Sequence, residues 1–122
     1  MQRTAMNLID PAMRECIDEC VRCHEGCLST VPYCLELGGQ HARETHVTLL
    51  LDCAEICQTS ANFMLRRSTL HPQTCAACAA VCERCAQDCE KFTDDPQMQM
   101  CAQSCRSCAE SCRRMASMAR AA

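Results

Sequence analysis

Residues 101–112 read Cys-Ala-Gln-Ser-Cys-Arg-Ser-Cys-Ala-Glu-Ser-Cys, so that cysteines recur after four, three and four positions. The same spacing occurs in two earlier segments and in part in a third. The cysteines concerned are Cys16, Cys20, Cys23 and Cys27; Cys75, Cys78, Cys82, Cys85 and Cys89; Cys53 and Cys57; and Cys101, Cys105, Cys108 and Cys112. Steps of three and four place side chains on one face of an α-helix. This is the seam that a helical bundle normally fills with Leu and Ile. The spacing therefore predicts helices that turn rows of thiols toward a shared interior.

Helix signals divide the chain into four segments of helical length. We expect helices at about 12–37, 41–67, 72–92 and 96–120. Asp10-Pro11 and Asp95-Pro96 each resemble an N-cap followed by proline at the first helical position, and His71-Pro72 resembles a weaker form of the same signal. These pairs therefore predict where three of the helices begin.

Two further sequence signals concern the shape and the end of the first helix. Gly38-Gly39 predicts its end, and Pro32 predicts a kink or an earlier end. Four helices with short links favour an all-α fold, an antiparallel up-down four-helix bundle with a short N-terminal segment. We expect a single domain over residues 1–122.

The composition narrows the class of protein. Sixteen of 122 residues are cysteine, above the ~8–10% that marks a cysteine-specialised chain. The net charge is only −3 and no basic patch stands out, so we expect no nucleic-acid partner. The N-terminus lacks the apolar region of a signal peptide, and no stretch approaches the ~18 apolar residues of a membrane span. These features predict a cytoplasmic protein with no membrane partner, in a compartment where thiols stay reduced.

The second half of the chain lacks ordinary core residues. From His71 to Ala122 there is no Leu and no Ile. Apart from Val81, Phe92 and a few methionines, the large residues there are polar. Because such helices could not bury enough apolar area, the thiols themselves must occupy the core.

Three alternatives fit the sequence poorly: cysteines that serve only as packing residues, a disulfide framework, and an iron–sulfur protein. Cysteine can pack as a small hydrophobe, but Ala, Val or Leu would do so without the risk of oxidation. Helical neighbours at i,i+3 or i,i+4 have Cβ atoms ~5–6 Å apart, whereas a disulfide needs ~3.5–4.5 Å, although pairs across helices could bridge. Iron–sulfur proteins of the ferredoxin type carry runs of C-x2-C-x2-C, and no such run occurs here.

The net charge left inside the bundle distinguishes the two remaining candidate metals, Zn²⁺ and Cu(I). Sixteen thiolates could form four tetrahedral Zn²⁺ sites, but eight negative charges would then stay buried, which is costly. Cu(I) is soft, selects thiolate and accepts two ligands. With each thiolate bridging two metals there is about one Cu(I) per cysteine and no net charge. The protonated empty form is neutral too, so loading exchanges protons for metal. The sequence favours a store of many Cu(I) ions, with a general zinc or soft-metal thiolate buffer as the alternative.

The chain also resembles the cytosolic copper storage proteins, a family of cysteine-lined four-helix bundles. The resemblance runs through segments 20–27, 34–39, 52–57, 75–85 and 105–113, which include Cys-Val-Arg-Cys-His-Glu-Gly-Cys and Cys-Ala-Ala-Cys-Ala-Ala-Val-Cys-Glu-Arg-Cys. It implies a homotetramer, many Cu(I) ions held mainly by cysteine, and reversible storage rather than catalysis. Relatives often carry His-x-His before the first cysteine of the fourth helix, where this chain has Met98-Gln99-Met100. Thioether ligation is the natural replacement.

Soft ligands gather at both ends of the predicted bundle. One end collects the seam residues Cys34, His46, Phe92 and Met98, with His41 and Met100 close by, and the other collects Met13, Met64, His71 and Met115. We expect the first end to be the mouth that admits copper, because Met and neutral His release Cu(I) more readily than thiolate does. The second end is expected to be a methionine plug.

The predicted metal ligands are therefore all sixteen cysteines, including Cys34. Possible accessory ligands are His41, His46, Met64, His71, Met98 and Met100. No nucleophile with a recognisable base is evident, so we expect no enzyme. A copper chaperone or a small thiol is the expected donor. Apolar residues spread widely around the second helix (Val47, Leu49, Leu51, Ile56, Phe63 and Leu65), which predicts that it contributes to a subunit interface.

Overall fold

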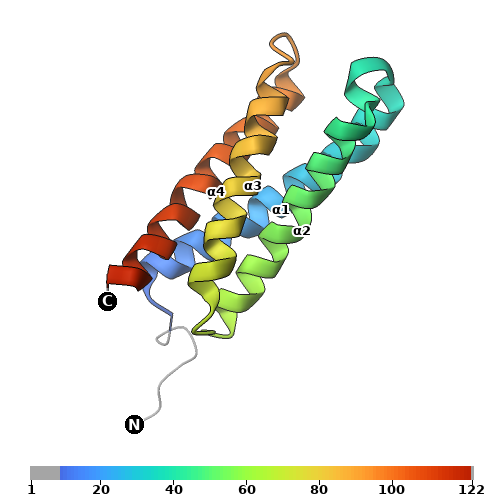
Figure 1. Ribbon diagram of the computed structural model, residues 1–122. Helices are drawn as coiled ribbons and strands as arrows, with labels where there is room; N and C mark the ends of the chain where they lie inside the picture. The colour runs from blue at the N-terminus through green and yellow to red at the C-terminus, as the bar shows by residue number, and fades with distance from the viewer. Residues whose placement is uncertain (1–8, 122) are drawn as a thin grey trace.

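The computed structural model describes residues 9–121, with side chains up to Met118. Their elements are α1 (Pro11–Leu37), the short 3₁₀ helix η2 (Gly39–Ala42), α2 (Glu44–Leu65), α3 (His71–Glu90) and α4 (Pro96–Ala121). Figure 1 shows each helix running opposite to the one before it, with the α1–α2 and α3–α4 links at one end of the molecule and the α2–α3 link at the other. The all-α four-helix bundle is confirmed, while the expected N-terminal segment, residues 1–8, lies outside the described residues.

Two aspartates begin their helices as the sequence predicts. Asp10 Oδ1 accepts a hydrogen bond from the Ala12 N–H at 3.3 Å. Asp95 Oδ1 accepts from the N–H groups of Gln97 and Met98 at 3.0 and 3.3 Å. Both caps satisfy N–H groups that the first helical turn cannot pair.

The predicted cap at His71 is wrong. His71 is the first residue of α3, and Leu70 in the cap position makes no side-chain hydrogen bond. The preceding turn is instead held by Ser68, whose Oγ accepts from the Leu70 N–H at 3.1 Å. A hydroxyl placed earlier in the turn therefore replaces the imidazole.

Pro32 does not end α1 early, because the helix continues to Leu37. Proline removes the donor for the carbonyl of Leu28, and both residues lie on the exposed side of the helix, where water can take over the lost hydrogen bond. The stop is made by Gly38, which adopts φ +72° and donates its N–H to the Cys34 carbonyl at 3.1 Å.

The second and third helices are shorter than expected. Residues 39–42 form the tight 3₁₀ turn η2, so α2 begins at Glu44 rather than near 41. It ends at Leu65, since Arg67 adopts φ +54° and Ser68 donates its N–H back to the Phe63 carbonyl at 2.9 Å. Helix α3 ends at Glu90 rather than 92. Among the described residues, no helix is both long and apolar enough to cross a bilayer.

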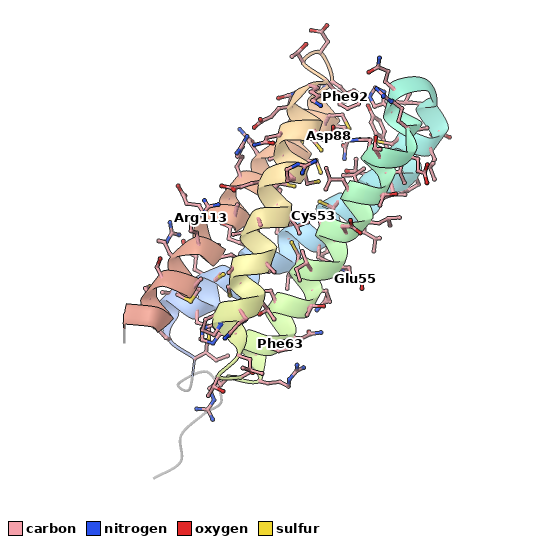
Figure 2. All side chains as sticks on the ribbon, viewed as in Figure 1. Cys53, Glu55, Phe63, Asp88, Phe92 and Arg113 are labelled. Atoms are coloured by element: carbon pink, nitrogen blue, oxygen red, sulfur yellow. The ribbon has the colours of Figure 1, made fainter. Side chains whose placement is uncertain are left out.

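The core of the bundle is made of sulfur. All sixteen cysteines are free and buried, and none is more than 4% exposed. The other fully buried large side chains include Ile17, Leu50, Met64 and Met98, and the layers between are filled by alanines. Figure 2 shows sulfur atoms, among them that of Cys53, between the helices, with Glu55 and Arg113 on the outside.

Candidate metal centre

The thiols form a continuous network along the bundle axis. Neighbouring Sγ atoms lie 3.5–4.0 Å apart and connect all four helices. The network runs through Cys101, Cys27, Cys105, Cys53, Cys82, Cys57, Cys108, Cys20, Cys112 and Cys16. Contacts also cross the bundle diagonally, as between Cys53 of α2 and Cys105 of α4 at 3.9 Å. The side chains thus bring together cysteines that are far apart in the sequence.

Several of these thiols form compact groups. Twelve of the sixteen belong to sets in which all Sγ atoms lie within 4.8 Å of one another. The sets are Cys20, Cys78, Cys108 and Cys112; Cys23, Cys53, Cys57 and Cys82; Cys23, Cys27, Cys53 and Cys105; Cys57, Cys78, Cys82 and Cys108; and Cys16, Cys75 and Cys112. Because sets share members, one thiol can bridge two metals.

The sulfur spacing suits metals held by two or three thiolates. Metal–thiolate bonds of about 2.3 Å place two sulfurs about 4.6 Å apart in a linear arrangement and about 4 Å apart in a trigonal one. Contacting sulfurs here are separated by distances such as 3.5 Å for Cys20 and Cys112 and 4.0 Å for Cys23 and Cys27. A shift of about 1 Å or less, within the reach of small side-chain adjustments, would admit a metal between them.

Protonation of the network depends on which thiols donate. Burial, with the nearby charges of Cys101 and Asp95, raises the pKa of Cys34 to about 11. Hydrogen bonding to Cys108 and burial also raise the pKa of Cys57. In contrast, hydrogen bonding with Cys112 and Cys20 lowers the pKa of Cys108 to about 7. A metal that binds a thiol with a raised pKa, such as Cys34 or Cys57, must displace its proton.

Three different soft donors meet at one end of the network. Cys34 Sγ lies 3.5 Å from His46 Nε2 and 3.7 Å from Met98 Sδ. All three side chains are buried, with exposed fractions of 0%, 4% and 0%. We call Cys34, His46 and Met98 the mouth ligands.

A carboxylate sets the orientation of His46. The His46 Nδ1–H donates to Asp88 Oδ2 at 2.5 Å, which in the neutral imidazole leaves the lone pair on Nε2, the nitrogen facing Cys34. A carboxylate on the far ring nitrogen is the usual support of a metal-binding histidine. Asp88 was not predicted, because it lies off the cysteine seam and no sequence pattern pairs it with His46.

Aromatic rings cover the mouth ligands. The Phe92 ring lies 4.2 Å from the His41 ring and 5.0 Å from the His46 ring, centre to centre. His41 Nε2 also lies 2.8 Å from Asp95 Oδ2, the same oxygen that accepts from the Tyr33 hydroxyl at 2.7 Å. Figure 2 shows Asp88 and Phe92 at the end with the α1–α2 and α3–α4 links. His41 is thus part of this cover and does not face Cys34.

The opposite end is filled by methionine. Met64 and Met115 are 0% and 4% exposed, and Cys75 Sγ donates to Met64 Sδ at 3.8 Å. Ser60 Oγ lies 3.5 Å from the same Cys75 sulfur. We call this the closed end; Figure 2 shows Phe63 near it.

Two of the possible accessory ligands, Met100 and His71, lie apart from the sulfur network, as does His24. Met100 is 65% exposed and lies on the outside of α4, because two residues turn a helix through about 200° from Met98. His71 Nδ1 is bonded to the Ser68 carbonyl at 2.9 Å. His24 Nδ1 is bonded to the Ala54 carbonyl at 2.7 Å. The structure brings His46 and Met98 to the cysteines, but it does not bring these three.

Comparison with known proteins identifies the family. The family model described as copper storage protein (Csp) matches residues 10–117. The chain belongs to the copper storage protein family. No curated protein sequence matches the chain, so the remaining similarities come from solved structures.

Members and neighbours of this family share the fold along most of their length. A protein from Nitrosospira multiformis is 45% identical, with a TM-score of 0.82 over 88% of this chain and 96% of that one. The Cu(I)-bound copper storage protein BsCsp3 of Bacillus subtilis is 36% identical, with a TM-score of 0.80 over 86% and 98%. The Streptomyces lividans copper storage protein Ccsp, loaded with 10 copper equivalents, is 27% identical, with a TM-score of 0.75 over 87% and 84%.

Proposed function

We propose that this protein stores Cu(I) in the cytosol, holding many ions on the thiolates of its core and thereby limiting copper toxicity. The single observation that carries the proposal is the burial of all sixteen cysteines as free thiols, twelve of which are joined by Sγ–Sγ contacts of 3.5–4.0 Å. Family membership supports it, as do the copper-loaded relatives, one of which is BsCsp3 with Cu(I) bound. The zinc alternative leaves more charge buried for the same thiols.

All sixteen cysteines serve as ligands in this proposal. Twelve belong to the compact groups, and Cys85, Cys89, Cys101 and Cys34 extend them toward the mouth through hydrogen bonds or nearby charge. Nothing in the arrangement resembles an enzyme site, because the thiols face one another rather than a substrate cavity. Storage without catalysis fits this geometry.

Copper passes through the mouth ligands Cys34, His46 and Met98. An imidazole oriented by Asp88 and a thioether bind Cu(I) more weakly than a bridging thiolate pair, so a metal held there can move inward or leave. A copper chaperone or a small thiol supplies the metal from outside. At the closed end, Met64 could add a thioether to a copper bound by Cys75.

We also propose that the chain forms a homotetramer in which α2 contributes to the interfaces. Leu51 of α2 and Leu28 of α1 are 44% and 46% exposed and line a shared hollow between the two helices. Exposed leucines of this kind favour association. Light scattering on the purified protein tests this, and a monomer at micromolar concentration would overturn it.

The decisive experiment for storage is an anaerobic titration of the reduced protein with Cu(I) against a chromophoric Cu(I) chelator, with a parallel Zn²⁺ titration. We expect about one Cu(I) per cysteine to be held against the chelator, and any zinc to be displaced by copper. Saturation at one or two copper ions, or zinc that resists copper, would overturn the proposal.

A further inference from the structure

The interior of the bundle does not by its shape distinguish copper from zinc. A tetrahedral zinc site needs four thiolates around one point. Four sets of four cysteine sulfurs, among them Cys20, Cys78, Cys108 and Cys112, lie within 4.8 Å of one another. Zinc that reached these thiols would find ligands, so discrimination by geometry must occur elsewhere.

The mouth ligands form a much poorer zinc site than the four-cysteine sets of the interior. They comprise one thiol, one imidazole and one thioether, so that at most one ligand is anionic. Cu(I) with the Cys34 thiolate forms a neutral pair, whereas Zn²⁺ with the same single anionic ligand keeps one positive charge, which the Asp88 carboxylate can offset only from beyond the imidazole. The nearby carboxylate of Asp88 is occupied by His46 Nδ1. A thioether is a soft donor that favours Cu(I), so Met98 adds affinity for copper and almost none for zinc.

A surface hollow also lies directly against the mouth. His46, Asp88 and Phe92 line a hollow of about 150 Å³ on the outside, while His46 Nε2 faces Cys34 on the inside. At the closed end Met64 and Met115 are buried, and along the described helices no cysteine is more than 4% exposed. A metal coming from the hollow therefore meets Cys34, His46 and Met98 before any pair of thiols.

We propose that Met98 determines the metal specificity of uptake: the mouth passes soft monovalent Cu(I) and excludes divalent Zn²⁺ before it reaches an interior that would bind either. Selection is then a property of the route rather than of the store. This inference rests on the proposed function, in which the mouth is the path of the metal.

Co(II), whose thiolate complexes absorb in the near ultraviolet, reports the access of a zinc-like ion to the thiols. We expect the folded, reduced wild-type protein to develop this absorption slowly. The variant Met98→His, which exchanges the thioether for a borderline donor that divalent ions accept, should develop it at least tenfold faster. The matched control is Met100→His on the exposed side of the same helix, which should behave as wild type. Met98→Cys provides a second anionic ligand and should also admit Co(II), so the test stands even if the histidine variant misfolds.

A second arm bypasses the mouth. Wild-type protein unfolded in denaturant with reductant and refolded with Co(II) should acquire tetrathiolate absorption that the folded protein does not. Equal Co(II) uptake by folded wild type and both Met98 variants would overturn the proposal, as would refolded wild type that still binds no Co(II). The Cu(I) titration of the wild type separates the two ideas, because a failure to hold many Cu(I) ions would reject storage whatever the Co(II) result.

Discussion

Each end of the sulfur network has a cysteine in contact with a methionine, but the two pairs have different surroundings. At the mouth Cys34 lies 3.7 Å from Met98, and at the closed end Cys75 lies 3.8 Å from Met64. The third partner of the cysteine is His46 Nε2 at one end and Ser60 Oγ at the other, each at 3.5 Å. Only the imidazole is a good ligand for a soft metal.

In the proposed function, the cysteine–methionine pair alone does not make a metal route. His46 is oriented by Asp88 and lines an outer hollow, whereas Cys75 and Met64 at the closed end are both 0% exposed. The same two sulfur donors can thus terminate the store at one end and open it at the other. The following changes test that contrast.

The largest expected effect comes from His46→Ala. If the imidazole contributes about 2–3 kcal/mol to the bound state through which copper passes, anaerobic Cu(I) uptake slows by roughly 30–160-fold. The final copper content should fall by no more than about one ion, since the interior thiols are unchanged. His71→Ala at the closed end is the control; an equal slowing in both variants would contradict the contrast between the ends.

Asp88→Asn should have a smaller effect at the same place. It removes the carboxylate that orients His46 while keeping the side-chain shape, and loss of such a support typically weakens metal binding at least about tenfold. Stopped-flow uptake should therefore slow by about that factor. Asp18→Asn, on the exposed surface of α1, provides a comparison, and uptake as fast as wild type by Asp88→Asn would show that the carboxylate does not position the imidazole.

Cys34→Ser and Cys75→Ser should lower the final copper content equally but differ in the rate of copper uptake. Each removes one terminal thiol, so the chelator titration should show about one Cu(I) fewer in both. Only Cys34→Ser should slow uptake, by a few-fold, because only that thiol stands on the route. Slower uptake by Cys75→Ser would mean that metal also passes the closed end.

The smallest effect concerns the metal-free protein in alkali. Burial is the main cause that raises the pKa of Cys34 to about 11. At Cys75 a lowering hydrogen bond with Cys112 is outweighed by Cys16 and burial, which bring the pKa to about 12. A thiol whose pKa is raised on folding contributes stability that is fully present below its unfolded pKa near 9. This contribution is lost as the pH rises from there through the folded pKa. Urea unfolding should therefore show a decrease on the order of 1 kcal/mol per thiol between pH 8 and 10.5.

Copper loading should abolish that dependence, because the thiolates then carry metal rather than protons. Cys34→Ala should weaken the dependence in the metal-free protein. An unfolding free energy that stays constant or rises over this interval would contradict the idea that the empty network is protonated.

Local signals in the sequence predicted most of the helices and the cysteine core. Asp10 and Asp95 cap helices because the interaction spans only two or three residues. The early end predicted at Pro32 does not occur, since the cost of proline depends on whether water reaches the Leu28 carbonyl, which is a property of the folded surface. Met100 was grouped with Met98 by proximity along the chain, but the helix turns it outward.

The missed partners share one feature. Asp88, Ser60 and Tyr33 act through contacts with residues on other helices or distant turns, at His46, Cys75 and Asp95. No pattern within a single helix marks them, because the rotation and register of one helix against the next are set by side-chain packing. Their roles could be identified only once the helices were placed together.

By itself the sequence determined that four helices carry rows of thiols on one face each, since spacing of three and four is a property of a single helix. It also determined that a monovalent soft metal would leave the least charge in the core, because that depends only on counting thiols. The tertiary structure alone decided which sulfurs meet, as Cys53 and Cys105 do across the bundle. It alone decided which end carries an oriented imidazole, because both outcomes depend on how four helices pack in space.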